Sequence, residues 1–170
     1  MNITIGHLYP DLLNLYGDRG NIQCLKKRCE WRGIRAEVKE FRSGDKVDFQ
    51  DLDIVLLGGG SDREQMIVCN KLQEIREDFK AYVESDGVVI AVCGGYQLLG
   101  DVVSDPENTE GGGSVRGMEL LRAKTVFTPE KRRSRTSGKF AQIEGAFAFL
   151  SGAEFSGYEI HMGRTEISGK

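Results

Sequence analysis

A seven-residue segment, residues 91–97 (AVCGGYQ), constrains the fold of this chain more than any other feature. It follows an apolar run at residues 88–90 and leads into a short helix-like segment that ends at Gly100. Glycines allow a sharp turn from a buried strand into a helix, and such a turn lifts its central residue into an exposed, strained position. That residue is Cys93, which indicates a thiol nucleophile.

Composition narrows the class of protein. The length fits one domain, residues 1–170, with room for a sizeable core. A net charge of −3 and a pI near 5.5 argue against nucleic-acid binding, which usually needs a basic face. We find no apolar stretch near the roughly 20 residues that span a bilayer, and no signal peptide at residues 1–5. Four cysteines without zinc-ligand spacing indicate reduced thiols, so we expect a cytoplasmic protein without a metal site.

Strands and helices are predicted to alternate along the first hundred residues. We expect strands at residues 3–8, 34–41, 52–57 and 87–92. We expect one helix from an Asp18 cap to Gly33, and another from a capping box at residues 61–64 to about Val83. This order predicts an α/β domain with a doubly wound, mostly parallel sheet and helices on both faces.

The pattern changes after Gly100. Residues 101–117 contain a proline and a glycine triplet and are predicted to form a loop. β-like segments follow at residues 120–127, 138–149 and 155–161. We expect them to form a β-rich C-terminal extension of the sheet, antiparallel or mixed, rather than a second domain.

A second glycine triplet, residues 58–60, follows the predicted strand at residues 52–57. Ligands of open α/β sheets bind at the carboxyl ends of the strands, where this triplet and Cys93 would meet. Its N–H groups, together with that of Gly94, could hold an oxyanion, and one such donor is worth about 100- to 1,000-fold in rate. A phosphate-binding loop is disfavoured because no Lys-Ser/Thr pair follows. A tight turn into a capped helix remains the alternative.

Cys93 differs from the other cysteines because it begins a helix. The helix dipole favours the thiolate by at most ~2 kcal/mol, little more than one pKa unit. Cys93 therefore needs a base, usually histidine, whose contribution is about 100- to 10,000-fold. Cys24, Cys29 and Cys69 are interpreted as small buried hydrophobic residues.

Residues 91–97 resemble the G-x-C-x-G-x-Q nucleophile motif of class I glutamine amidotransferases, with Ala91 in place of the first glycine. Three segments narrow the resemblance to the cobyric acid synthase-like branch: residues 13–21 (LNLYGDRGN), 58–65 (GGGSDREQ) and 157–165 (GYEIHMGRT). Within this branch the sequence is most similar to the glutaminase subunits of lipid II isoglutaminyl synthases. The resemblance covers about residues 3–165 and implies a flavodoxin-like fold.

The resemblance also implies a reaction. Cys93 would attack the side-chain amide of L-glutamine, release ammonia and leave a glutamyl thioester that water hydrolyses. Gly94 and the 58–60 turn, above all Gly60, would hold the oxyanion. Ammonia would pass to a Mur-ligase-like partner subunit that activates the D-glutamate carboxyl of lipid II in peptidoglycan synthesis. ATP and Mg²⁺ would bind to that partner, and no cofactor is implied for this chain.

Two further residues are assigned to glutamine binding by the resemblance. Gln97, one helical turn past Cys93, would face the bound glutamine. Arg135 aligns with the arginine that holds glutamine in the isoglutaminyl synthase subunits. A solvated loop is the alternative interpretation of residues 131–135 (KRRSR).

The sequence departs from the family at the catalytic histidine. In the family this residue lies downstream, in a Gly-Thr-Tyr-x-His-Gly type segment that the sequence does not contain. His7 ends the first predicted strand, and His161 belongs to a different family motif. We therefore expect a C-terminally truncated part of a longer protein, with little turnover alone and with Cys93 still open to alkylation.

Two other functions stay open. The chain resembles the amidotransferase domain of corrinoid-modifying synthases, although such domains usually follow an ATP-binding domain, whereas this sequence starts at its first strand. A non-catalytic α/β module that binds a partner would fit the missing histidine, but such a module has no need of the nucleophile turn.

Overall fold

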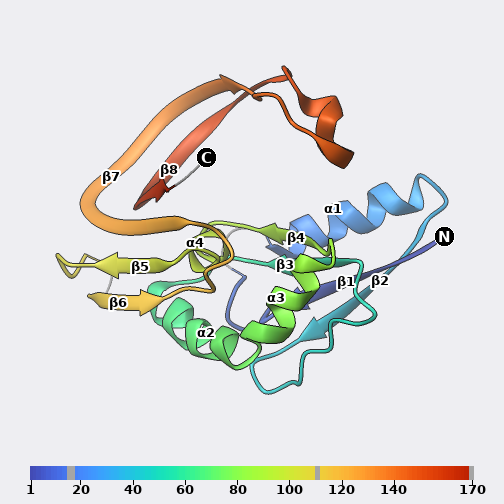
Figure 1. Ribbon diagram of the computed structural model, residues 1–170, viewed down its shortest axis with the longest axis horizontal. Coiled ribbons are helices and arrows are strands. Elements are labelled where there is room, and N and C mark those ends of the chain that lie inside the picture. Colours follow the sequence, from blue (N-terminus) through green and yellow to red (C-terminus); the bar gives the residue numbers. More distant parts are fainter. Residues whose placement is uncertain (15–17, 110–111, 169–170) are drawn as a thin grey trace.

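The computed structural model describes residues 1–14, 18–109 and 112–168. The first half of the chain forms a parallel four-stranded sheet in the order β2-β1-β3-β4 (Figure 1). Its strands are β1 (Asn2–Leu8), β2 (Arg35–Phe41), β3 (Ile54–Leu57) and β4 (Val88–Ala91). The chain order reverses between β1 and β3, and in open α/β sheets such a reversal marks the ligand-binding crevice.

Helices pack on both faces of this sheet. They are α1 (Asp18–Glu30), α2 (Asp62–Glu74), α3 (Arg76–Glu84) and the short α4 (Gly94–Leu98). Side chains of β3 alternate between the two faces: Leu56 packs with Ile22 of α1, whereas Val55 and Leu57 belong to the larger core with α2 and α3. The predicted doubly wound α/β fold is confirmed.

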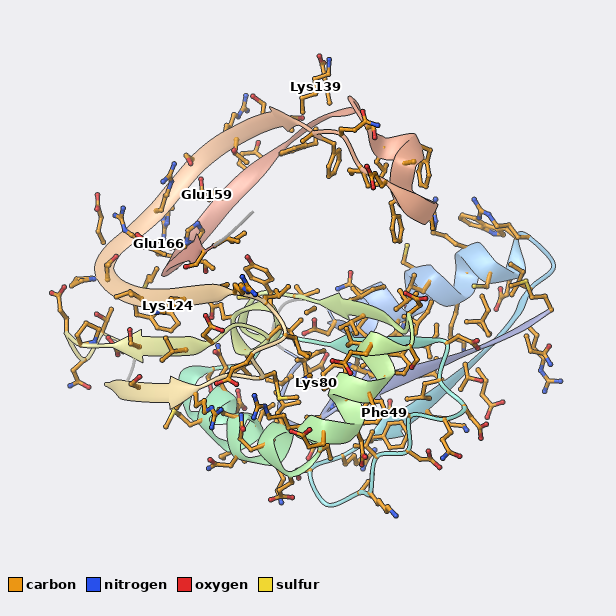
Figure 2. All side chains as sticks on the ribbon, in the orientation of Figure 1. Phe49, Lys80, Lys124, Lys139, Glu159 and Glu166 are labelled. Atoms are coloured by element: carbon orange, nitrogen blue, oxygen red, sulfur yellow. The ribbon has the colours of Figure 1, made fainter. Side chains whose placement is uncertain are left out.

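The larger core includes a segment without regular structure. Phe49 lies between β2 and β3, and its ring stacks on that of Phe79 in α3, with the ring centres 5.3 Å apart (Figure 2). Within the described residues, none of the helices has the length and apolar character needed to cross a bilayer.

The second half of the chain forms a separate sheet in the order β6-β5-β7-β8. Its strands are β5 (Val102–Asp105), β6 (Gly113–Arg116), β7 (Ala123–Lys139) and β8 (Glu154–Ile167). Strands β7 and β8 make a long antiparallel hairpin that arches away from the parallel sheet (Figure 1). The C-terminal extension is therefore β-rich, as predicted, but the expectation that it continues the first sheet is wrong.

Two local predictions in this half are wrong. Residues 101–117 were expected to form a loop, but they contain β5 and β6. The carboxylate of Asp105 accepts the N–H groups of Thr109 (2.8 Å) and Gly112 (2.9 Å), which lie between the two strands. Residues 138–149 were expected to be β-like, but β7 ends at Lys139 and a 3-10 helix, η1, covers Gly145–Leu150.

The long helix predicted from the capping box is two helices. α2 ends at Glu74 and α3 begins at Arg76, and the residue between them, Ile75, interrupts the helix with a φ of −108° and a ψ of 11°. Ile75 packs against the larger core. Neither glycine nor proline stands there, so the sequence carries no local signal for the break. Asp18 was predicted to cap α1, but it is the first helical residue, and its carboxylate accepts the Gly59 N–H at 3.4 Å.

Candidate active site

Cys93 stands in the connection between β4 and α4. Its φ of 52° and ψ of −115° lie in a region that costs a residue other than glycine on the order of 1–3 kcal/mol. The side chain is exposed. The first helical hydrogen bond of α4 runs from the Gln97 N–H to the Cys93 carbonyl, at 3.1 Å. The strained, exposed turn is therefore present, and the nucleophilic role of Cys93 stays a prediction.

The two glycines after Cys93 bring α4 into contact with the end of β3. A Cβ on Gly95 would lie 2.5 Å from the Leu57 carbonyl oxygen. A Cβ on Gly94 would lie 2.5 Å from the side-chain amide carbon of Gln65 in α2. Real Cβ atoms do not come so close to other atoms, so only glycine fits at either position without displacing its neighbour.

The triplet at residues 58–60 occupies the carboxyl end of β3, next to this turn. A Cβ on Gly58 would lie 2.6 Å from the carboxylate carbon of Asp18, and one on Gly60 would lie 2.8 Å from the Leu12 carbonyl oxygen. Since the Gly59 N–H already donates to Asp18, Gly60 is the better candidate for an oxyanion donor.

One side chain joins the two predicted oxyanion residues. The Gln65 amide nitrogen donates to the Gly60 carbonyl at 3.0 Å, and the same amide lies against Gly94. The structure thus brings Gly60 and Gly94 to one buried amide group. Their role in holding an oxyanion stays a prediction.

The glycine triplet also leads directly into a capped helix, as the alternative interpretation expected. The Glu64 carboxylate accepts hydrogen bonds from the Ser61 N–H (2.8 Å) and hydroxyl (2.7 Å). These bonds, first that from the hydroxyl, lower the pKa of Glu64 below its usual value. Helix capping and an oxyanion role do not compete, because they use different backbone groups.

Gln97 points towards the second sheet. Its amide nitrogen lies 2.7 Å from the position that a Cβ on Gly163 of β8 would occupy. Its amide oxygen is buried and has no hydrogen-bond partner within the described residues. The buried amide oxygen is therefore a hydrogen-bond acceptor without a donor within the described residues. The contact of Gln97 with bound glutamine stays a prediction.

Arg135 lies on the β7–β8 hairpin. It pairs with Tyr158, and its guanidinium carbon lies 5.7 Å from the centre of the tyrosine ring. Gly163, which contacts Gln97, is five residues further along β8, roughly 16 Å at about 3.3 Å per residue. The structure therefore does not bring Arg135 beside Gln97. The surrounding segment is an exposed strand rather than the solvated loop considered from sequence.

The structure places the two histidines in different surroundings, and a role of either as the base of Cys93 is not part of the prediction. His161 contacts acceptors through both ring nitrogens, at 2.7 Å to Glu159 and at 2.5 Å to the Gly163 carbonyl. The hydrogen bond from His161, followed by the charge of Arg132, lowers the pKa of Glu159, which lies on the hairpin (Figure 2). His7 is buried in β1, and its burial lowers its pKa.

The remaining cysteines have different environments. Cys69 is buried, as predicted, and its burial raises the pKa of its thiol. Cys24 is exposed and Cys29 is half-buried, so the expectation that both are buried is wrong. Both lie on α1, whose outer face is open to solvent. Within the described ranges, no cluster of three or more His, Cys, Asp or Glu side chains is arranged to hold a metal ion.

Two residues that contact the glycine triplet were not assigned a role in the site from the sequence. Gln65 and Asp18 each contact the glycine triplet, and each belongs to a segment that carries the family resemblance. Gln65 is the fourth residue of α2, which begins two residues after the triplet, and from this position its side chain reaches back to Gly60. Three members of the segment around Asp18, residues 15–17, lie outside the described residues.

Residues 4–170 match the model of the CobB/CobQ-like glutamine amidotransferase domain. The chain belongs to this family. Its relatives include the lipid II isoglutaminyl synthase (glutamine-hydrolyzing) subunit GatD of Staphylococcus aureus, 34% identical over 96% of this chain and 62% of that protein. The subunit GatD of Streptococcus pneumoniae is also 34% identical, over 98% of this chain and 60% of that protein.

Cobyric acid synthases of the same family match a smaller part of the chain. That of Lachnoclostridium phytofermentans is 45% identical over 50% of this chain and 17% of that protein. The chain thus spans about 60% of the length of the two GatD relatives and a much smaller share of the cobyric acid synthase. The resemblance seen in the sequence motifs is confirmed at the level of the family.

Proposed function

We propose that this chain is the glutamine-hydrolysing part of a lipid II isoglutaminyl synthase. The observation that carries the proposal is the turn at Cys93, which is exposed, strained and packed against the glycine triplet at residues 58–60. The GatD relatives support the same assignment because their similarity extends over 96–98% of the chain.

In the proposed reaction the Cys93 thiolate attacks the side-chain amide carbon of L-glutamine. The carbonyl oxygen becomes an oxyanion, which the N–H groups of Gly60 and Gly94 stabilise. Collapse of the tetrahedral intermediate breaks the C–N bond, and the leaving nitrogen takes a proton and departs as ammonia. Water then cleaves the glutamyl thioester and regenerates the thiol. Each oxyanion donor contributes about 100- to 1,000-fold in rate.

The proton transfers need a group that neither histidine of this chain supplies. His161 already contacts two acceptors, and His7 is buried within β1. We therefore expect slow glutamine hydrolysis by these 170 residues alone. Alkylation of Cys93 needs only the thiolate and a bound electrophile, so it should persist.

The ammonia acceptor lies outside this chain in the proposed reaction. A Mur-ligase-like partner subunit would use ATP and Mg²⁺ to activate the D-glutamate carboxyl of lipid II. The activated carboxyl would be an acyl phosphate formed from ATP. Ammonia released at Cys93 would attack this carboxyl carbon, displace the phosphate and form the amide. The expected setting is the cytoplasm, where the precursors of peptidoglycan are assembled.

The proposal is tested with a chloroketone analogue of glutamine. The analogue should alkylate Cys93, L-glutamine should protect against it, and Cys93→Ser should abolish labelling, as measured by peptide mass spectrometry. Cys24 is also exposed and provides an internal control. Iodoacetamide should label both cysteines, whereas the analogue should label Cys93 alone. Equal labelling of Cys24, or a lack of protection by glutamine, would contradict the proposal.

A corrinoid-modifying amidotransferase is the second candidate, because the match to a cobyric acid synthase reaches 45% identity over part of the chain. Both candidates predict labelling of Cys93 by the glutamine chloroketone. Co-purification with a Mur-ligase-like subunit, followed by ATP-dependent amidation of lipid II, would support the first. Amidation of a corrinoid carboxylate would support the second. A module that only binds a partner would show neither labelling nor amidation.

A further inference from the structure

Gln65 contacts both of the turns from which the proposed oxyanion hole is built. It is the fourth residue of α2, and only 8% of its surface is exposed. Its amide nitrogen donates to the Gly60 carbonyl oxygen at 3.0 Å. A Cβ on Gly94 would lie 2.5 Å from its amide carbon and 2.5 Å from its amide nitrogen. No larger residue fits at position 94 while Gln65 stays in place.

The hydrogen bond to Gly60 has a consequence for the neighbouring backbone. Glycine has wide conformational freedom, so the direction of the Gly60 N–H is not set by its own residue type. A bond that holds the Gly60 carbonyl fixes the peptide plane between Gly60 and Ser61. The Gly60 N–H belongs to the preceding peptide plane, so the bond narrows the range of directions that this N–H can take. Oxyanion donors are effective only when they are fixed before the reaction begins.

The contact with Gly94 sets the distance between the two turns. The Gln65 amide fills the space between the triplet after β3 and the first turn of α4. A shorter side chain would leave a gap, and a longer one would push the turns apart. The same side chain therefore influences the direction of one donor and its separation from the other.

We propose that Gln65 is a positioning residue that fixes the Gly60 and Gly94 N–H groups as one preorganised oxyanion hole. The proposal rests on the proposed function, because it assumes that an oxyanion forms at Cys93. Helix capping does not explain Gln65, since its amide donates to the Gly60 carbonyl and the N–H of Ser61, the N-cap residue, already donates to Glu64.

The test compares two variants with a matched control. Gln65→Glu keeps the shape but replaces the donating amide with an ionised carboxylate, and Gln65→Met also removes the acceptor. Gln73→Met is the control. Gln73 lies on the same helix and also donates to backbone carbonyls, those of Arg116 (3.2 Å) and Gly117 (3.0 Å), but these belong to the second half of the chain.

The readout is the alkylation of Cys93 by two reagents. The ketone oxygen of the glutamine chloroketone would occupy the oxyanion hole, whereas iodoacetamide reports only the thiolate and its exposure. Both Gln65 variants should lower the maximal chloroketone rate by about 10- to 100-fold, part of the loss expected for removing a donor, with less change in the half-saturating concentration. The iodoacetamide rate of Gln65→Met should stay within about twofold of the unmodified chain, because the helix dipole at Cys93 is unchanged. In Gln65→Glu the added negative charge also disfavours the Cys93 thiolate, so the chloroketone rate of that variant is compared after division by its iodoacetamide rate.

The outcomes separate this proposal from the one it rests on. If L-glutamine fails to protect the unmodified chain, the proposed function fails and the role of Gln65 fails with it. If the unmodified chain is labelled and protected but Gln65→Glu reacts equally fast, only the role of Gln65 is overturned. If Gln73→Met slows the chloroketone as much as the Gln65 variants do, the effect is one of general stability, and the positioning role is overturned.

Discussion

Gly95 of α4 and Leu57 of β3 are in such close backbone contact that a Cβ on the glycine would lie 2.5 Å from the leucine carbonyl oxygen. Strand β3 and the turn at Cys93 can therefore approach this closely only because residue 95 has no side chain. Because the obstructing atom belongs to the backbone of a buried strand, it cannot rotate away as the end of a side chain could.

Gly95→Ala should therefore separate α4 from β3. We expect a loss of about 1–3 kcal/mol in the free energy of unfolding, as for other overpacked positions, and loss of chloroketone labelling at Cys93. Urea denaturation and mass spectrometry measure the two effects. Gly44→Ala is the control, since a Cβ there meets no atom within 4 Å. A Gly95→Ala variant as stable and as reactive as the unmodified chain would refute this account of the turn.

Gly163→Ala should disturb Gln97 without unfolding the chain. The added Cβ would meet the Gln97 amide nitrogen at 2.7 Å and the Thr125 methyl carbon at 2.9 Å, and both of these atoms are the ends of side chains. If Gln97 faces bound glutamine, the half-saturating concentration of the chloroketone should rise several-fold. Gly157→Ala, in the same strand and with open space around its Cβ, should leave that concentration unchanged. Equal behaviour of the two variants would remove Gln97 from the binding site.

Gly20→Ala should stabilise the chain. Gly20 lies in α1, and a Cβ there would meet no atom within 4 Å. The backbone of alanine has less conformational entropy in the unfolded chain than that of glycine, and therefore less to lose when the helix forms. We expect a gain of about 0.5–1 kcal/mol in the free energy of unfolding. The midpoint of urea denaturation should rise accordingly. A lower midpoint would mean that the exposed surface of α1 makes a contact that the substitution blocks.

Tyr9 should make the stability of the chain depend on pH in the alkaline range. Burial, followed by the nearby charges of Glu74 and Asp11, raises its pKa to about 12 from the usual 10.0. The unfolded chain releases the phenolic proton first, so this contribution to stability is complete below pH 10 and is lost as the pH rises towards 12. We expect a loss of about 1 kcal/mol between pH 9 and pH 11.

Tyr9→Phe removes the ionisable group and tests this expectation. The loss of unfolding free energy between pH 9 and pH 11 should be smaller in the variant by about that amount. Tyr82, whose pKa burial also raises, should account for part of the remaining dependence. If Tyr9→Phe and the unmodified chain lose the same unfolding free energy between pH 9 and pH 11, Tyr9 is not the responsible group.

Local sequence patterns predicted the parallel sheet better than the second sheet. The buried strands of the first half are short apolar runs separated by capped helices, and β3 and β4 lie where those runs do. In the second half, Pro106 and the nearby glycines indicated a loop, whereas the Asp105 carboxylate closes a turn between two strands. The break at Ile75, which packs against the core, had no local signal either, because neither glycine nor proline stands there.

The sequence alone determined the α/β fold, the position of Cys93 after a buried strand and the membership in an amidotransferase family. These depend on apolar periodicity and on glycines at fixed places, which are local properties of the chain. Only the tertiary structure decided that Gln65 joins Gly60 to Gly94 and that Arg135 lies out on a hairpin. Such relationships depend on how separate elements pack. The exposure of Cys24 likewise depends on tertiary structure, because no other element packs over that side chain within the described residues.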